Sequence, residues 1–104
     1  MIISSTETVP GREVSEVLGI VRGNVVRARF FGRDIVAGLR TIVGGEVDEY
    51  TKLMGESREQ AFDRMVADAD RLRADAIVNV RFSTAMIMQG ASEILAYGTA
   101  VRLK

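Results

Sequence analysis

The chain has no cysteine, histidine or tryptophan, and only one proline and two lysines among its 104 residues. Without cysteine it can form no disulfide framework and no thiol nucleophile. A zinc site of ordinary type is nearly excluded, because such sites are built mainly from cysteine and histidine. Histidine-assisted nucleophilic catalysis is absent for the same reason. Few familiar routes to enzyme chemistry remain.

Charge of one sign is also missing, since 14 basic residues balance 14 acidic ones. This balance argues against a broad nucleic-acid or acidic-membrane footprint, which needs clustered excess cations. No basic leader precedes an apolar run, and no apolar stretch reaches the roughly 20 residues of a membrane span. We therefore expect one soluble, cytoplasmic domain over residues 1–104. Arginine carries nearly all the positive charge, which suits fixed carboxylate pairing at interfaces.

The first half of the chain predicts a strand and then two helices. Residues 13–29 are rich in valine and isoleucine and read as a strand, bent or bulged at Gly19 or Gly23. Residues 2–3 could add a small edge strand. Apolar residues then recur every three to four positions over 30–43, and Gly44-Gly45 ends that short helix. A second helix is expected from about residue 46 to residue 73.

The second half predicts a hairpin, because the apolar period becomes two after residue 75. The turn falls at residues 89–92. On the last strand one face is small throughout, which indicates that something packs closely against it. Simple alternation assigns the side chains of the first hairpin strand to two faces: Ala76, Val78, Val80, Phe82, Met86 and Met88 on one, and Ile77, Asn79, Arg81 and Ser83 on the other.

These elements give the order β–α–α–β–β and an α+β fold, with a three-stranded antiparallel sheet packed by a long helix. Such a sheet leaves one face uncovered and two edges unpaired. Edges of this kind are covered, charged or paired with another chain. Because both faces of the hairpin are apolar, we expect pairing with another copy of the chain.

Metal binding has one candidate pair, Met86 and Met88. Two thioethers spaced two apart on a strand can serve soft copper(I). The more common role of methionine is to fill gaps in a core or interface. Glu46, Asp48 and Glu49 could bind a hard ion, but they lack calcium-loop spacing.

A second set of candidates surrounds the glycine hinge: Asp34, Arg40, Glu49 and Tyr50, with Asn79 and Arg81 expected nearby on the sheet. Carboxylates, guanidinium and phenol in one place can hold a polar ligand or tune a pKa for acid–base catalysis. A salt-bridge network within or between subunits is the interpretation we favour. Gly44-Gly45 before a helix could cradle an anion, although the acids that follow would repel phosphate.

Several of these residues form a pattern that resembles one known family. The hinge residues Asp34, Ala37-Gly38-Leu39-Arg40, Gly44-Gly45 and Tyr50, the helix residues Arg58 and Ala61, and the segments 74–81 and 98–101 are similar, in order and spacing, to the YbjQ-like family. One departure is Leu72-Arg73 before Ala74-Asp75, where the family commonly has a glycine.

The resemblance implies a dodecin-like subunit, a homo-pentameric ring and a heavy-metal-binding label. From it we expect a non-enzymatic homo-oligomeric module that binds a small ligand or ion at its subunit boundaries. The alternatives are a heavy-metal-binding protein and a small enzyme that uses the hinge carboxylates. No cofactor follows from the sequence, and the expected partner is a second copy of the chain.

Overall fold

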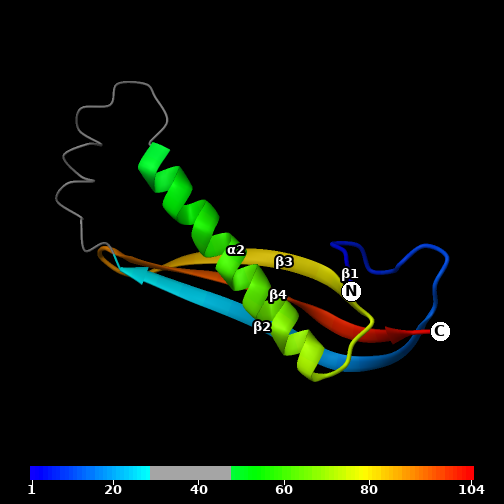
Figure 1. Ribbon diagram of the computed structural model, residues 1–104. Coiled ribbons are helices and arrows are strands. Elements are labelled where there is room, and N and C mark those ends of the chain that lie inside the picture. Colours follow the sequence, from blue (N-terminus) through cyan, green and yellow to red (C-terminus); the bar gives the residue numbers. More distant parts are fainter. Residues whose placement is uncertain (29–47) are drawn as a thin grey trace.

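The computed structural model describes residues 1–28 and 48–104, in which one long helix crosses a twisted sheet (Figure 1). The sheet has four strands in the order β1-β3-β4-β2. The elements are β1 (Ile2–Ile3), β2 (Val14–Ala28), α2 (Asp48–Arg71), β3 (Ala76–Met88) and β4 (Ala91–Leu103). The predicted α+β class is confirmed. The predicted helix over residues 30–43 lies outside the described residues.

The expected three-stranded antiparallel sheet is wrong in one respect, because β1 adds a fourth strand that runs parallel to β3. Ile2 pairs with Ala76 and Ile3 with Ile77. The contact continues past the strand, where the Ser4 amide donates to the Ile77 carbonyl at 2.9 Å. The other two pairings, β3 with β4 and β4 with β2, are antiparallel. The sheet is therefore mixed, and the possible edge strand at residues 2–3 is real.

Helix α2 ends at Arg71, two residues earlier than predicted. Arg73 adopts a left-handed conformation with φ of 57°, and the Ala74 amide donates to the Ala69 carbonyl at 3.2 Å. A left-handed residue after the last turn is a common way to end a helix, and glycine is the usual choice because it lacks Cβ. Arg73 takes that position here, in the segment where the YbjQ-like family commonly has a glycine.

The main core lies between α2 and the sheet. Ala61, Met65 and Ala69 of the helix are fully buried against Val21 and Val25 of β2 and against β4. The small face predicted on the last strand is this contact surface, with Ala96 and Ala100 completely buried. Small residues on β4 allow the helix to approach closely, as predicted.

Gly23 sets how near the helix comes to β2. A Cβ at this position would lie 2.2 Å from the Ala61 carbonyl oxygen and 2.4 Å from the Met65 backbone nitrogen. Backbone atoms of a helix cannot move aside locally, so the close approach requires glycine. The bend in β2 falls instead at Gly19, where φ is 130° and the register with β4 shifts.

The helix also closes the outer edge of β2. The Asp68 carboxylate accepts a hydrogen bond from the Arg22 amide at 3.2 Å. The Arg64 guanidinium donates to the Asn24 carbonyl at 2.6 Å. Farther along, Arg27 donates to the Ser57 hydroxyl at 3.1 Å and to Gln60 at 2.7 Å. Side chains of α2 thus occupy backbone groups that an added strand would need.

Strand β3 changes face at a bulge near Asn79. Its register with β4 shifts between Val78 and Arg81, and Asn79 has a φ of 56°. Ile77 and Val80 consequently both flank Gly98 on the side of the main core. The predicted sharing of one face by Ala76, Val78, Val80 and Phe82 is therefore wrong, because one extra residue inverts the alternation.

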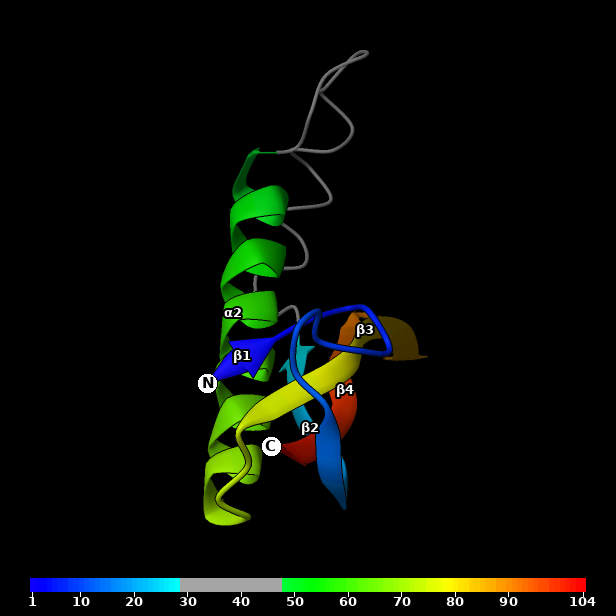
Figure 2. The same cartoon turned by 90° about the vertical axis from the view of Figure 1, so that its right-hand side faces the viewer.

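The face opposite α2 has a smaller core at one end. Ala76 and Val78 pack there with Val101 and Leu103, and Val9 of the segment between β1 and β2 contacts them. Figure 2 shows the helix on one side of the sheet and this segment passing around β3 toward β2. The rest of this surface is called the open face. It comprises Ile20, Arg22, Asn24 and Val26 of β2, Glu93, Leu95, Tyr97 and Thr99 of β4, and Arg81, Ser83 and Ala85 of β3.

Two glycine-to-alanine changes should shift stability in opposite directions. Gly23→Ala forces a methyl group into the α2 backbone and should lower the free energy of unfolding by about 3 kcal/mol, the upper end of overpacking costs. Gly55→Ala lies within α2, where the nearest atom is 3.9 Å away, and should raise it by about 1 kcal/mol. Urea unfolding followed by circular dichroism measures both. Equal losses in the two variants would contradict the close approach at Gly23.

Candidate functional site

The six predicted ligand or interface residues are only partly within the described structure. Asp34 and Arg40 lie outside the described residues. Glu49 and Tyr50 belong to the first turn of α2, and their side chains are likewise outside the described part. Asn79 and Arg81 lie on β3, in and just after the bulge. The predicted convergence of the hinge carboxylates on the sheet therefore stays a prediction.

Around Arg81 the register builds a polar row across the open face. Tyr97 of β4 pairs directly with Arg22 on one side and with Arg81 on the other. Directly opposed residues of antiparallel strands project from the same face with neighbouring Cβ atoms. The side chain of Arg22 projects from the face opposite the helix, because the neighbouring Gly23 faces α2 and side chains alternate along a strand. A phenol thus lies between two exposed guanidinium side chains.

The N-terminal segment holds the bulge that places Arg81 in this row. The Asn79 amide donates to the Thr6 carbonyl at 2.9 Å, and the Val80 amide donates to the Ser4 carbonyl at 3.0 Å. One guanidinium nitrogen of Arg81 donates to the Ser5 carbonyl at 2.8 Å and to the Val80 carbonyl at 2.9 Å. The bulge is thus bonded on its outer side, and one terminal nitrogen of the Arg81 guanidinium is held by two backbone carbonyls.

Neither arginine of the row forms an ion pair within residues 1–28 and 48–104. The ion pairs in those ranges join Arg71 to Asp68, Arg102 to Glu16 at 3.6 Å and Lys104 to Glu13 at 3.2 Å. On the open face, Glu93 accepts a hydrogen bond from the Asn24 side chain at 3.1 Å. Within the described part of the chain, the guanidinium groups of the row therefore have no carboxylate bonded to them.

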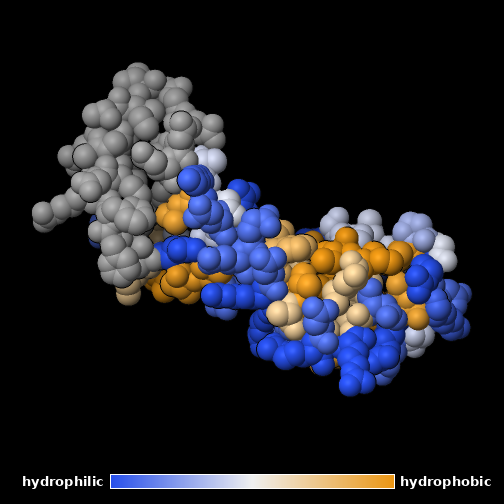
Figure 3. Space-filling view, viewed as in Figure 1, coloured by the Kyte–Doolittle hydropathy of each residue, from blue (hydrophilic) through white to orange (hydrophobic). Residues whose placement is uncertain are grey.

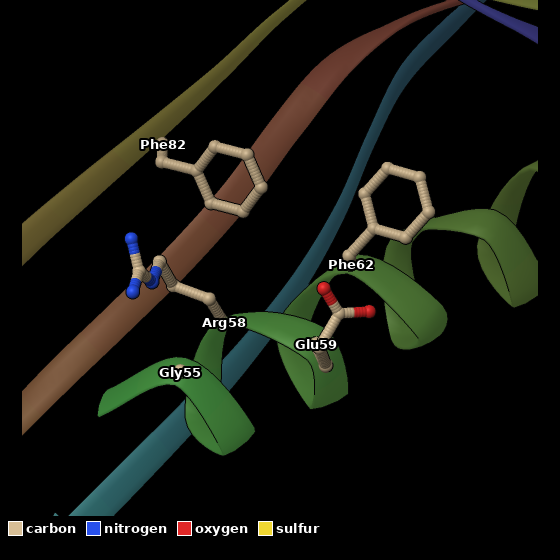
Figure 4. A pocket seen from close by; sticks show the side chains of 5 residues that line it. All are labelled: Gly55, Arg58, Glu59, Phe62 and Phe82. Carbon is tan, nitrogen blue, oxygen red and sulfur yellow. The ribbon is translucent and has the colours of Figure 1, made fainter. Parts of the chain in front are cut away.

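A separate hollow lies between α2 and β3, with a volume of about 410 Å³. Its lining residues are Gly55, Arg58, Glu59, Phe62 and Phe82. Figure 4 shows the rings of Phe62 and Phe82 on either side of the hollow, with the Arg58 side chain reaching toward the Phe82 side. Phe82 reaches this side of the sheet because of the bulge. The hollow is wide and mostly apolar, with one cationic and one anionic group at its margin.

The thioether candidates lie near the hairpin turn and are accessible. Met86 is 74% exposed and Met88 64% exposed. Met86 pairs with Ser92 and Met88 with Ala91, so a second register irregularity separates them. Because Ser92 and Ala91 are consecutive, the simple alternation that would place both sulfurs on one side of the strand does not hold. Among the described residues, Asp and Glu form no group of three or more that could hold a metal ion.

Two hydrogen bonds to the carboxylate of Asp68 affect its pKa. The Arg71 side chain donates a hydrogen bond to its carboxylate, and the Arg22 amide donates a second. These bonds, with the nearby charges of the same two arginines, hold the pKa of Asp68 below its ordinary value of 3.8, against a smaller opposing effect of burial. The carboxylate therefore stays ionised and bonded to β2 at neutral pH.

None of the helices that the structure describes is long and apolar enough to cross a membrane.

Comparison with known proteins decides the family. The family described as "Putative heavy-metal-binding" matches residues 1–104, the whole chain. The chain belongs to the YbjQ-like family. Relatives named UPF0145 protein share 59% identity over 104 residues in Archaeoglobus fulgidus and 57% over 103 residues in Vibrio campbellii. These alignments cover 100% and 99% of this chain, and 96% and 99% of the relatives.

A solved structure with 16% sequence identity shares the fold of this YbjQ-like chain. It is the crystal structure of a protein of unknown function from the DUF74 family of Pediococcus pentosaceus, with a TM-score of 0.66. The match covers 100% of this chain and 98% of the other. At this identity the likeness shows the architecture alone.

Sequence reasoning missed two members of the polar row, Arg22 and Tyr97. Each looks unremarkable in its own segment, an arginine among valines and a tyrosine in an alternating strand. They meet Arg81 only through the pairing of β4 with both neighbours and through the bulge at Asn79. Alternation could have placed Arg22 and Tyr97 away from the helix, but it assigned Arg81 to the same face as Ile77, which faces α2.

Asp68→Asn should weaken the fold in a pH-dependent way. Because the folded-state pKa of Asp68 is lowered, its contribution is present above the ordinary pKa of 3.8 and is lost as pH falls through the folded value. The wild type should exceed the variant in thermal midpoint at pH 7, and the gap should close below about pH 4. Asp63→Asn, an exposed change on the same helix, is the control. A gap that persists unchanged at pH 2 would contradict the assignment.

Proposed function

We propose that the protein is a non-enzymatic subunit that assembles with copies of itself, as a pentamer, and binds a small ligand or ion at the subunit boundaries. The observation that carries the proposal is the unequal treatment of the two sheet edges. Helix α2 bonds to the backbone of β2 at Arg22 and Asn24, whereas β1 covers only the beginning of β3. Residues 81–88 of β3, which we call the open edge, have no strand partner on their outer side within the described chain.

The side chains of the open edge support a protein partner. Phe82 is 48% exposed, and Met86, Ile87 and Met88 are each more than half exposed. A long, apolar, unpaired edge is a template for pairing with another chain unless something covers it. Apolar residues also reach the surface on both sides of α2 in Figure 3. We assign a second copy of the chain as the partner. A strand from that copy would pair with the free backbone groups of the open edge and would cover its apolar side chains at the same time.

A ring needs two different surfaces on each subunit, because the contact is head to tail. The beginning of β2 supplies the second one. Val17 is 66% exposed and Ile20 is 76% exposed there, before the point where α2 reaches the strand edge. In this proposal the assembly is cytoplasmic and takes neither nucleic acid nor membrane as a partner, in keeping with its balanced charge.

Single lysine substitutions test the assembly. Wild-type protein at micromolar concentration should show five times the 11.4 kDa of one chain by light scattering and native mass spectrometry. Met86→Lys places a charge on the open edge and should shift dissociation to at least about tenfold higher concentration, because a charge blunts edge pairing. Leu72→Lys, at an exposed position after α2, is the control and should leave the mass unchanged.

Two outcomes would contradict this proposal. A monomeric wild type at micromolar concentration removes the assembly altogether. The second is a Met86→Lys variant that keeps the wild-type mass while Ile20→Lys dissociates. That result would mean that the open edge is not part of the subunit boundary and that the contact lies at the beginning of β2.

Heavy-metal binding is a second candidate, supported by the family description and by two exposed thioethers. Copper(I) is the ion that thioether sulfur favours. Anaerobic competition with a copper(I) chelator should then show one ion per chain, lost in Met86→Leu/Met88→Leu and kept in Met54→Leu. Binding that survives the double substitution would exclude these two sulfurs as ligands.

A further inference from the structure

We infer that Arg22, Tyr97 and Arg81 form a site for a small organic phosphate on the open face, beside the open edge at which the proposed subunits meet. This inference deepens the proposed function, since it names the ligand class of the module. It starts from the register, in which both arginines pair directly with Tyr97. The two outer strands of such a row are about 9–10 Å apart, twice the strand spacing. Two extended arginine side chains can converge on one anion above the ring between them.

The charges of the row favour an anion. Two exposed arginines project from the same side of the sheet, and the carboxylates nearest to them accept hydrogen bonds from other groups. Glu93 is bonded by Asn24. Asp68 is bonded by Arg71 and the Arg22 amide, and the Arg22 charge also lowers the pKa of Asp68, so Arg81 is the arginine of the row with no carboxylate near it among the described residues. An unpaired pair of like charges is unfavourable by itself and becomes favourable when a doubly charged anion lies between them.

The bulge indicates that this arrangement is built. Ile77 faces the helix. If β3 had no bulge, side chains would alternate regularly from Ile77, Arg81 would face α2 as well, and Arg22 would be the only arginine beside Tyr97. The extra residue at Asn79 turns Arg81 to the open face, and the carbonyl of Ser5 holds one of its nitrogens at 2.8 Å. Bulges that redirect a side chain occur often beside functional sites. The remaining guanidinium nitrogens have no protein partner among the described residues.

The neighbouring rows select phosphate over carboxylate. Thr99 lies in the row on one side, and Asn24 and Ser83 lie in the row on the other. Hydroxyl and amide donors around two guanidinium forks match the several oxygens of a tetrahedral dianion better than the two of a planar carboxylate. Ile20, Leu95 and the Tyr97 ring add apolar surface for an organic group. A phosphate monoester combines both parts.

Phenyl phosphate, inorganic phosphate and benzoate are the probes, used with the full-length protein in calorimetric titrations at pH 8 and low salt. Phenyl phosphate should bind more tightly than inorganic phosphate, and benzoate should bind most weakly. Arg81→Gln and Arg22→Gln should each weaken phenyl phosphate at least about tenfold, as expected for a lost charge-assisted bond. Arg81→Lys should recover part of the loss, because it restores the charge without the fork.

Two controls separate this site from other cationic surfaces. Arg12→Gln removes an exposed arginine whose Nε donates to the Lys104 carbonyl, far from the row, and should leave affinity unchanged. Arg58→Gln tests the hollow between α2 and β3 and should also leave it unchanged. Benzoate binding equal to phenyl phosphate, or an Arg81→Gln loss no larger than that of Arg12→Gln, would overturn the inference.

Native mass spectrometry of the same samples keeps the two proposals apart. A monomeric wild type that binds phenyl phosphate through Arg22 and Arg81 sinks the assembly and supports the site. An assembled wild type that binds none of the three probes supports the assembly and contradicts the phosphate site. If Arg81→Gln changes the assembled mass together with affinity, these arginines are subunit contacts, and the phosphate site is overturned.

Discussion

The arrangement of this molecule depends on the single extra residue at Asn79. Before it, β3 directs Ile77 into the core under α2 and gives Ala76 and Val78 to the smaller core on the other side. After it, the assignment is exchanged, so that Val80 and Phe82 face the helix and Arg81 faces the open side. Without that residue the hollow would lose Phe82 and the polar row would lose Arg81. One backbone irregularity thus decides both candidate sites.

The bulge is stable because its exposed backbone groups are bonded. The amides of Asn79 and Val80 donate to carbonyls of residues 4–6, which follow the two-residue strand β1. Asparagine tolerates the left-handed conformation better than the β-branched residues around it, since its side chain is short and polar. The N-terminal segment therefore does more than extend the sheet. It fixes the point at which β3 changes face.

The sequence allowed the α+β class, the long helix and the hairpin to be predicted, because each has a strong period. It also indicated close packing against one face of β4, because the side chains of that face, at Ala96, Gly98 and Ala100, are all small. The bulge was not predictable, because Val-Asn-Val-Arg follows ordinary alternation and the backbone bonds that hold the bulge come from residues 4–6, at the other end of the chain. The polar row was missed for the same reason. Its three members are far apart in sequence and meet only through register, which alternation by itself does not fix.

Helix α2 covers one edge of the sheet, at β2, and leaves the other edge, at residues 81–88 of β3, without a strand partner among the described residues. Each of these edges carries one arginine of the polar row. Helix α2 closes the edge of β2 at Arg22 and Asn24, and in doing so it uses the backbone of Arg22 while its side chain stays on the open face. The open edge of β3 begins at Arg81, the other arginine of the row. A strand added along that edge would lie beside Arg81, so that a neighbouring subunit would wall one side of the proposed phosphate site. Pairing along that edge would use the backbone of β3, whereas the row uses the side chain of Arg81. Assembly and anion binding would therefore depend on different groups of one residue.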